Sequence, residues 1–141
     1  MNETLDTSQL MATVNMLDDF DDALSALHAL ADLDKTAAEK LALEILVQQK
    51  GDVYFQASCF DVLYSTSLQR ALEYMKENVR HVDVYLLGTM MSNVAEDLGI
   101  IQEHPEIKDA VIILKKSVLS RSAAEIESIR DDLDWFNQTY P

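Results

Sequence analysis

Residues 52–63 read DVYFQASCFDVL, and residues 83–94, thirty-one positions later, read DVYLLGTMMSNV. Both phrases open with Asp-Val-Tyr and continue with apolar or small residues at matched positions, such as Ala57 in the first and Gly88 in the second. A helix that is apolar nearly all round is covered on two sides. We therefore interpret each phrase as an Asp-capped inner helix of a helix pair, in which the small residue lets a neighbouring helix approach closely. Pairs of about 30–40 residues have the size of helical-repeat units.

The rest of the chain has the periodicity of helices rather than of strands. Apolar residues recur at intervals of three and four, and 3 Gly and 2 Pro in 141 residues are far too few for a turn-rich β protein. The predicted fold class is therefore all-α, with about eight helices arranged as stacked antiparallel pairs in an α-solenoid. An irregular helical bundle is the alternative. No linker or low-complexity stretch divides the sequence, which predicts a single helical domain over residues 1–141.

Local sequence patterns predict where several helices begin and end. The patterns TAAE, which begins at Thr36, and SAAE, which begins at Ser122, are typical of capping boxes. We expect the helix that Thr36 caps to end at Gly51, since glycine commonly ends helices. The helix that Ser122 caps is expected to run without a break through Phe136.

The net charge of −14 is concentrated in the first quarter of the chain. Residues 1–34 hold eight acids and no Lys or Arg, residues 35–120 hold twelve acids and nine bases, and residues 121–141 hold five acids and two bases. Such charge repels nucleic acid and anionic lipid and attracts basic surfaces, although it also serves solubility. The N-terminus has no basic n-region, and the apolar runs are too short to span a membrane. We expect a cytoplasmic protein that binds neither nucleic acid nor membrane.

The first phrase, together with YSTSLQRALEYMKENV over residues 64–79, resembles HEAT-like helical repeats. More narrowly, residues 52–120 resemble the small HEAT-like immunity proteins that are encoded beside bacterial toxins, including those of contact-dependent growth inhibition. The Pro that usually lies in the first helix of a HEAT unit is absent, because only Pro105 and Pro141 occur. The resemblance implies a binding protein that blocks a toxin's active site or an exosite, and it supplies no catalytic residues.

The sequence assembles no catalytic or metal site, so we expect no enzyme activity, no metal and no cofactor. It contains no Glu-x-x-His pair, no calcium loop and no Gly-rich phosphate loop. The three histidines, His28, His81 and His104, are scattered. Cys59 lies between apolar residues and is interpreted as a buried small hydrophobe. A spatial pairing of this thiol with His28 or His81 is the alternative.

Four aspartates and two tyrosines are the predicted partner-binding residues. They are Asp18, Asp19, Asp21, Asp22, Tyr54 and Tyr85. The aspartates form a dense carboxylate surface that suits the positive cleft of a nuclease, although they also suit a helix start. The tyrosines occupy matched positions just inside two helix starts, and Tyr is enriched at interface hot spots; core packing is the alternative. Trp135, Phe136 and Tyr140 are expected to pack the last helix as a closing cap of the repeat.

Composition and resemblance together predict an immunity protein that binds and neutralises a cognate bacterial toxin, with a basic nuclease domain as the expected target. The alternative is an acidic helical adaptor or secretion chaperone that binds a basic protein. In either case we expect the chain to be a monomer before it binds its partner.

Overall fold

The computed structural model of the chain describes residues 6–16, 19–96 and 105–141. This part of the chain contains helices and no strand, which confirms the predicted all-α fold class. The helices are α1 (Thr7–Met16), α2 (Phe20–Leu33), α3 (Lys35–Gln48), α4 (Val53–Thr66), α5 (Leu68–Asn78), α6 (Val84–Glu96), α7 (Glu106–Val118), α8 (Ala123–Ser128) and α9 (Arg130–Thr139).

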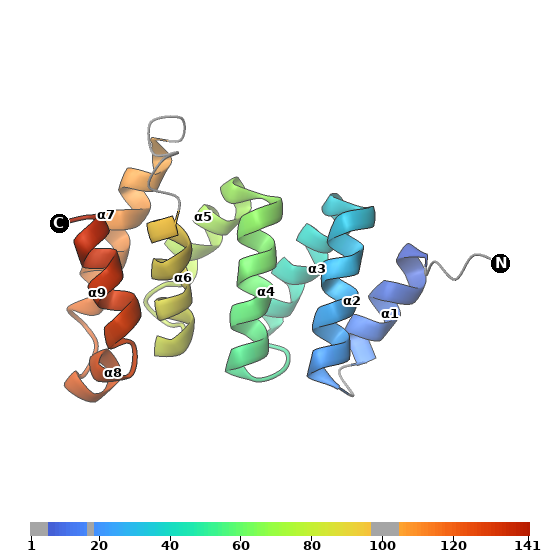
Figure 1. The fold of residues 1–141 in the computed structure, drawn as a ribbon, viewed down its shortest axis with the longest axis horizontal. Helices are drawn as coiled ribbons and strands as arrows, with labels where there is room; N and C mark the ends of the chain where they lie inside the picture. Colours follow the sequence, from blue (N-terminus) through green and yellow to red (C-terminus); the bar gives the residue numbers. More distant parts are fainter. Residues whose placement is uncertain (1–5, 17–18, 97–104) are drawn as a thin grey trace. The chain divides into compact units, whose positions relative to one another are not determined.

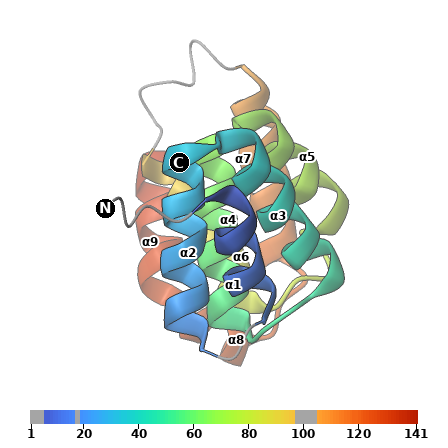
Figure 2. The same ribbon diagram turned by 90° about the vertical axis from the view of Figure 1, so that its right-hand side faces the viewer.

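The chain divides into two compact units, Met1–Leu68 and Gln69–Pro141, and each is described by itself. In the first unit, α2 packs against α1, α3 and α4, and α3 also packs against α4. The ribbon views place α2 and α4 side by side in one layer, with α3 in a second layer (Figure 1, Figure 2). The apolar faces of these helices meet in a core that includes Leu27, Leu30, Ile45, Leu46, Phe60 and Leu63.

In the second unit, α6 packs against α7, α8 and α9, and α8 packs against α9. Helices α6 and α9 lie side by side in one layer, and α5 and α7 lie in the other (Figure 1, Figure 2). The core of this unit includes Met75, Leu86, Leu87, Met90, Met91 and Phe136. The single domain over residues 1–141 and the stacking of helix pairs from one unit to the next stay predictions.

The two repeated phrases form equivalent helices, α4 in the first unit and α6 in the second. Asp52 accepts a hydrogen bond from the Phe55 N–H at 2.8 Å, and Asp83 accepts one from the Tyr85 N–H at 2.8 Å, so each phrase begins at an Asp cap. Five matched pairs are buried in both helices; they are Phe55 and Leu86, Ala57 and Gly88, Cys59 and Met90, Phe60 and Met91, and Leu63 and Val94. Both phrases thus form Asp-capped helices with matched buried positions, and their role as inner helices of repeated helix pairs stays a prediction.

Gly88 is the point of close approach that the repeat predicted. A Cβ atom built on Gly88 would lie 2.9 Å from Ile129 Cγ2 and 2.9 Å from Asp132 Oδ2, closer than real side chains pack. Asp132 is held in place because the Ser92 hydroxyl donates to its carboxylate at 2.7 Å. The absence of a side chain at Gly88 therefore lets the start of α9 lie directly on α6.

One of the two predicted capping boxes is formed. Ser122 accepts a hydrogen bond from the Glu125 N–H at 3.1 Å, and its own N–H donates to the Glu125 carboxylate at 3.1 Å. The box at Thr36 is not formed, because the N-cap of α3 is Asp34, whose carboxylate accepts from the Ala37 N–H at 3.1 Å. An aspartate two residues earlier therefore starts the helix before Thr36 is reached.

Two helix ends also differ from the prediction. Helix α3 ends at Gln48 rather than at Gly51, because Gln49 adopts the left-handed conformation with a φ of 55° and its N–H bonds back to carbonyls of the last turn. The helix expected to run through Phe136 is broken at Ile129 into α8 and α9. The described residues thus contain nine helices rather than about eight.

Candidate protein-interaction surface

Charged side chains are segregated between the layers of the first unit. The layer of α2 and α4, all of which is described, carries no Lys or Arg, and its exposed acids are Asp21, Asp22, Asp32 and Asp61. Helix α3 in the other layer carries two lysines and two glutamates and is balanced. The α2–α4 layer therefore presents the negative surface of this unit.

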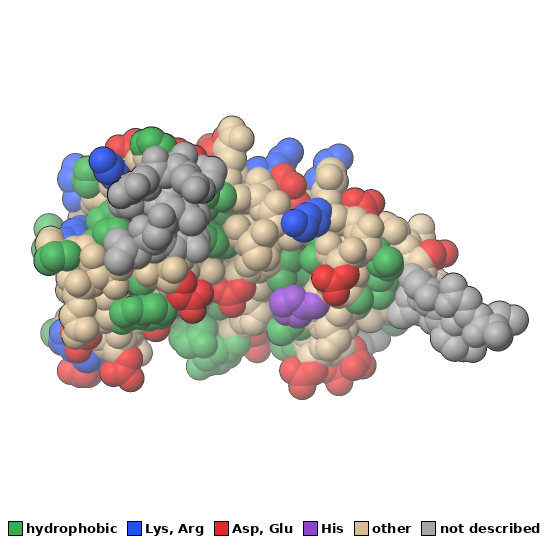
Figure 3. All heavy atoms as spheres, turned by 45° about the horizontal axis from the view of Figure 1, so that its top comes forward, with side chains coloured by type: hydrophobic (Ala, Val, Ile, Leu, Met, Phe, Trp, Pro, Cys, Tyr) green, Lys and Arg blue, Asp and Glu red, His purple; other side chains and the backbone are tan. Residues whose placement is uncertain are grey.

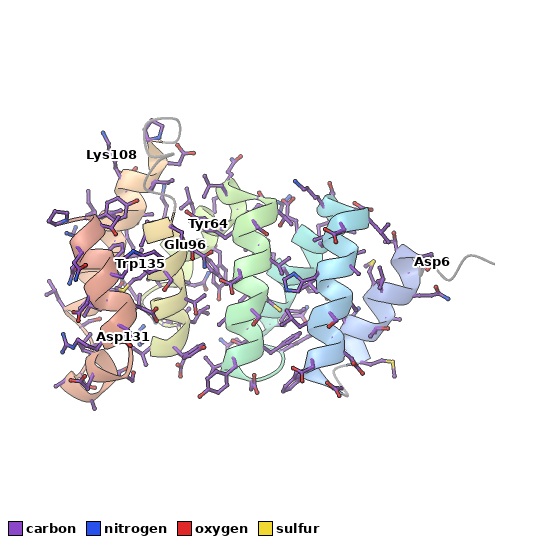
Figure 4. The ribbon with its side chains drawn as sticks, viewed as in Figure 1. Asp6, Tyr64, Glu96, Lys108, Asp131 and Trp135 are labelled. Atoms are coloured by element: carbon purple, nitrogen blue, oxygen red, sulfur yellow. The ribbon has the colours of Figure 1, made fainter. Side chains whose placement is uncertain are left out.

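The same segregation recurs within the second unit. Helices α6 and α9 carry one base, Arg130, and four acids, which are Glu96, Asp131, Asp132 and Asp134. Figure 4 shows Glu96 on α6 and Asp131 on α9. Helices α5 and α7 carry five bases and four acids. In each unit, the net negative charge thus lies on the layer that contains one of the two repeated helices.

Four of the described aromatic side chains are exposed, and all four lie on these acidic layers. Phe20 and Tyr54 are 39% and 63% exposed on α2 and α4, and Tyr85 and Trp135 are 44% and 41% exposed on α6 and α9. Trp135 is labelled on α9 in Figure 4. Aromatic residues are enriched in protein–protein interfaces relative to the rest of a protein's surface. Their confinement to the acidic layers marks these layers as the candidate interaction surface.

A stacked pair of rings brings the acidic run and one tyrosine together in the first unit. Asp19 caps α2 by accepting hydrogen bonds from the N–H groups of Asp21 at 2.8 Å and Asp22 at 3.2 Å. The next residue, Phe20, stacks on Phe55 of α4, with ring centroids 5.3 Å apart. This contact places the beginning of α2 beside the beginning of α4.

Tyr54 precedes Phe55 in the chain, so it lies at the same end of the layer. We call the set Asp19, Phe20, Asp21, Asp22 and Tyr54 the acidic–aromatic patch. In Figure 3, acidic side chains gather at the end of α2 where that helix begins. Helix N-termini stabilise nearby carboxylates, so the aspartates are compatible with a stable fold as well as with a basic ligand.

The structure unites four of the six predicted site residues. Asp19, Asp21, Asp22 and Tyr54 belong to the patch, Asp18 lies outside the described residues, and Tyr85 belongs to the second unit. The prediction missed Phe20, whose neighbours Asp19 and Asp21 were the only signal that it lies in a charged surface.

The prediction that Trp135 packs in a closing cap is wrong, because the indole is 41% exposed. Phe136 is fully buried as expected. The Tyr140 ring lies 5.6 Å from that of Phe136, and its hydroxyl donates to the Val94 carbonyl at 2.9 Å. Two of the three aromatic residues therefore fix the end of the chain on α6, while the third belongs to the candidate surface.

Cys59 is unsuited to nucleophilic chemistry. Its side chain is fully buried, and burial, with a smaller contribution from the negative charge of Asp61, raises the pKa of the thiol to about 12. A thiol in this environment stays protonated at neutral pH and out of reach of a substrate. The described residues also contain no group of three or more His, Cys, Asp or Glu side chains able to hold a metal ion.

Comparison with protein families, curated proteins and solved structures found no match to this chain. No helix within the described ranges is both long and apolar enough to cross a membrane.

Proposed function

We propose that the chain is a binding protein for a basic protein partner and that the acidic–aromatic patch is its principal contact. The observation that carries the proposal is the coincidence of negative charge and exposed aromatic rings on one layer of each unit. Carboxylates steer a positive surface into contact, and aromatic side chains supply contact area at little cost in conformational entropy.

The partner class that best fits this surface is a bacterial toxin with a nuclease domain, which the chain would neutralise as its cognate immunity protein. A nuclease cleft is positively charged because its substrate is a polyanion. A carboxylate surface that covers the cleft inhibits the enzyme without chemistry of its own. The resemblance of residues 52–120 to HEAT-like immunity proteins favours the same assignment, and we place the encounter in the cytoplasm, with the chain a monomer until it binds.

The first experiment identifies the partner. The tagged chain is used to capture proteins from its native host, and each captured protein is tested for nuclease activity with and without the chain. An immunity protein requires a captured nuclease whose activity falls as the chain is added in equimolar amount. A captured basic protein that has no toxic activity, coupled to a secretion system, would instead identify an adaptor or chaperone.

The second experiment tests the surface. In the first variant, three aspartates on α2 that are not caps are replaced, as Asp21→Asn, Asp22→Asn and Asp32→Asn. The control removes the same charge from the other layer of the second unit, as Glu73→Gln, Glu77→Gln and Asp109→Asn. We expect the α2 variant to slow association by about tenfold at low salt and to flatten its salt dependence, because steering is electrostatic.

The control variant should bind nearly as fast as the wild type. If both variants slow association equally, net charge rather than the α2–α4 layer attracts the partner, and the proposed surface is wrong. A further variant, Tyr54→Ala, should speed dissociation by about tenfold, since a central aromatic contact acts mainly on the dissociation rate.

A further inference from the structure

A cavity of opposite charge lies within the Gln69–Pro141 unit, on the side of α5 and α7. It has a volume of about 500 Å³ and is lined by Arg80, Ile113, Lys116, Ser117 and Ser120. Small-molecule sites usually have volumes of about 300–1,000 Å³. Of the lining residues that the structure describes, two are cations and two carry hydroxyl groups, so the cavity is suited to an anion.

Neither cation of this cavity has an ion-pair partner among the residues that the structure describes, although the chain contains 25 acids. Other bases of the same unit do find acids. Arg121 lies 3.2 Å from Glu125, and Arg130 lies 3.8 Å from Glu127. Two bases therefore lie together in this cavity, and none of its described lining residues is a carboxylate, an arrangement that favours an anion.

Capping of the α7 C-terminus does not account for Lys116. The carbonyl of Lys116 itself accepts from the Leu119 N–H at 3.2 Å. The Ser117 carbonyl accepts from the Ser120 N–H at 3.2 Å and from the Ser120 hydroxyl at 2.8 Å. Because main-chain groups and one serine already satisfy these carbonyls, the ammonium group is not required as a C-terminal cap.

The walls of the cavity are tied together by Arg121. Its guanidinium group donates to the carbonyls of Val79 at 3.2 Å and Val82 at 2.7 Å, on either side of Arg80, and to Glu125 at 3.2 Å. Arg121 itself follows Ser120 directly in the chain. The turn that carries Arg80 is therefore fixed against the segment that carries the other polar lining residues, and the cavity is built before any ligand arrives.

We propose that this cavity binds the phosphoryl group of a small phosphorylated molecule. The planar guanidinium group of Arg80 can bond two phosphate oxygens, and Lys116 supplies a point charge to a third. Ser117 and Ser120 add polar side chains to the lining. The volume exceeds that of a single oxyanion, and Ile113 provides an apolar wall for the organic part of the ligand.

The test is a ligand titration at constant ionic strength, in which binding is detected from shifts of the amide NMR signals of the uniformly labelled full chain. The probes are inorganic phosphate, ribose 5-phosphate and ribose. We expect both phosphates to shift signals around residues 80 and 116–120, ribose 5-phosphate to bind more tightly than phosphate, and ribose to shift none. Arg80→Gln and Lys116→Gln should each weaken binding by at least about tenfold, as expected for the loss of a charge-assisted hydrogen bond.

The matched control is Lys108→Gln, which removes an exposed charge from the same helix, outside the cavity. It should leave the affinity for both phosphates unchanged. If Lys108→Gln weakens phosphate binding as much as the cavity variants do, the phosphates are attracted diffusely to basic side chains and the proposed site is wrong. The proposed site is also wrong if phosphate shifts no signal. Equal affinity for phosphate and ribose 5-phosphate would overturn the assignment of a larger ligand.

Discussion

At Gly88, helix propensity and packing have opposite effects on stability. The sign of the stability change in Gly88→Ala therefore shows which of the two effects is larger. Gly88→Ala in the middle of α6 should gain about 1 kcal/mol, because alanine is the better helix former. The new Cβ would meet Ile129 Cγ2 and Asp132 Oδ2, each at 2.9 Å, and the Ile129 Cβ at 3.3 Å. Overpacking of this kind costs about 1–3 kcal/mol.

The cost at Gly88 should fall in the upper half of that range. Ile129 is β-branched, 3% exposed and part of the junction between two helices, so its Cγ2 cannot turn away freely. Asp132 is held by its 2.7 Å hydrogen bond to Ser92. The packing loss therefore exceeds the gain in propensity, and we expect Gly88→Ala to destabilise the protein by about 1 kcal/mol, with Gly88→Leu worse.

The measurement is urea denaturation, with circular dichroism as the probe of unfolding. A stability change at Gly88 should shift the midpoint and leave the slope of the transition unchanged. The control is Thr89→Ala, at the next position of the same helix and partly exposed, which should change stability by less than about 0.5 kcal/mol. If Gly88→Ala is instead more stable than the wild type by the full propensity gain, α9 does not lie against α6 at this point.

Three further predictions follow from single residues. Arg121→Ala should cost about 2–4 kcal/mol in urea denaturation, because charge-assisted bonds to two carbonyls and a carboxylate are lost; a loss below about 1 kcal/mol would contradict its role as a clamp. Cys59, with a pKa of about 12 against 9.0 for a free thiol, should resist alkylation until the protein unfolds, and stability should fall as pH rises through this interval because only the unfolded thiol ionises. Ser122→Ala should cost about 1 kcal/mol. Hydrogen bonds from the Ser122 N–H and from Arg121 lower the pKa of Glu125, so its stabilisation is present at neutral pH and fades as pH falls through that lowered pKa; an acid titration of stability should be flatter in Glu125→Gln, which removes the titrating carboxylate.

Elements whose signals are local were predicted correctly from the sequence. The Asp caps of α4 and α6 and the box at Ser122 each depend on side chains within three residues of the N–H groups they satisfy. Thr36 shows the limit of such reasoning, because an equally local competitor, Asp34, caps the helix by accepting from the Ala37 N–H. Two caps of similar strength lie close together there, and the pattern alone does not rank them.

Features that depend on tertiary contacts were missed. No Gly or Pro marks the break at Ile129, and the residues on both sides favour a continuous helix. The break accompanies a contact with Gly88, forty-one positions away in the chain. The cavity is similar, since Arg80 and Lys116 come from different segments and share no motif. Likewise, the packing of α2 on α4, including the stacking of Phe20 on Phe55, places Tyr54 at the same end of the layer as the aspartates.

Helix capping explains some of the aspartates on the α2–α4 layer but not all of them. Asp19 satisfies two N–H groups, and Asp21 and Asp22 lie in the first turn, where the helix dipole favours negative charge. Asp32 lies in the last turn of α2, where the dipole disfavours a carboxylate, and Asp61 lies in the middle of α4.

The helix dipole therefore does not select the exposed carboxylate of Asp32. The proposed binding of a basic partner would account for it. For this reason Asp32 tests the proposed function more sharply than the aspartates at the start of the helix. Substitution of Asp32 alone should raise stability slightly and slow association with the partner, a combination that a purely structural role does not produce.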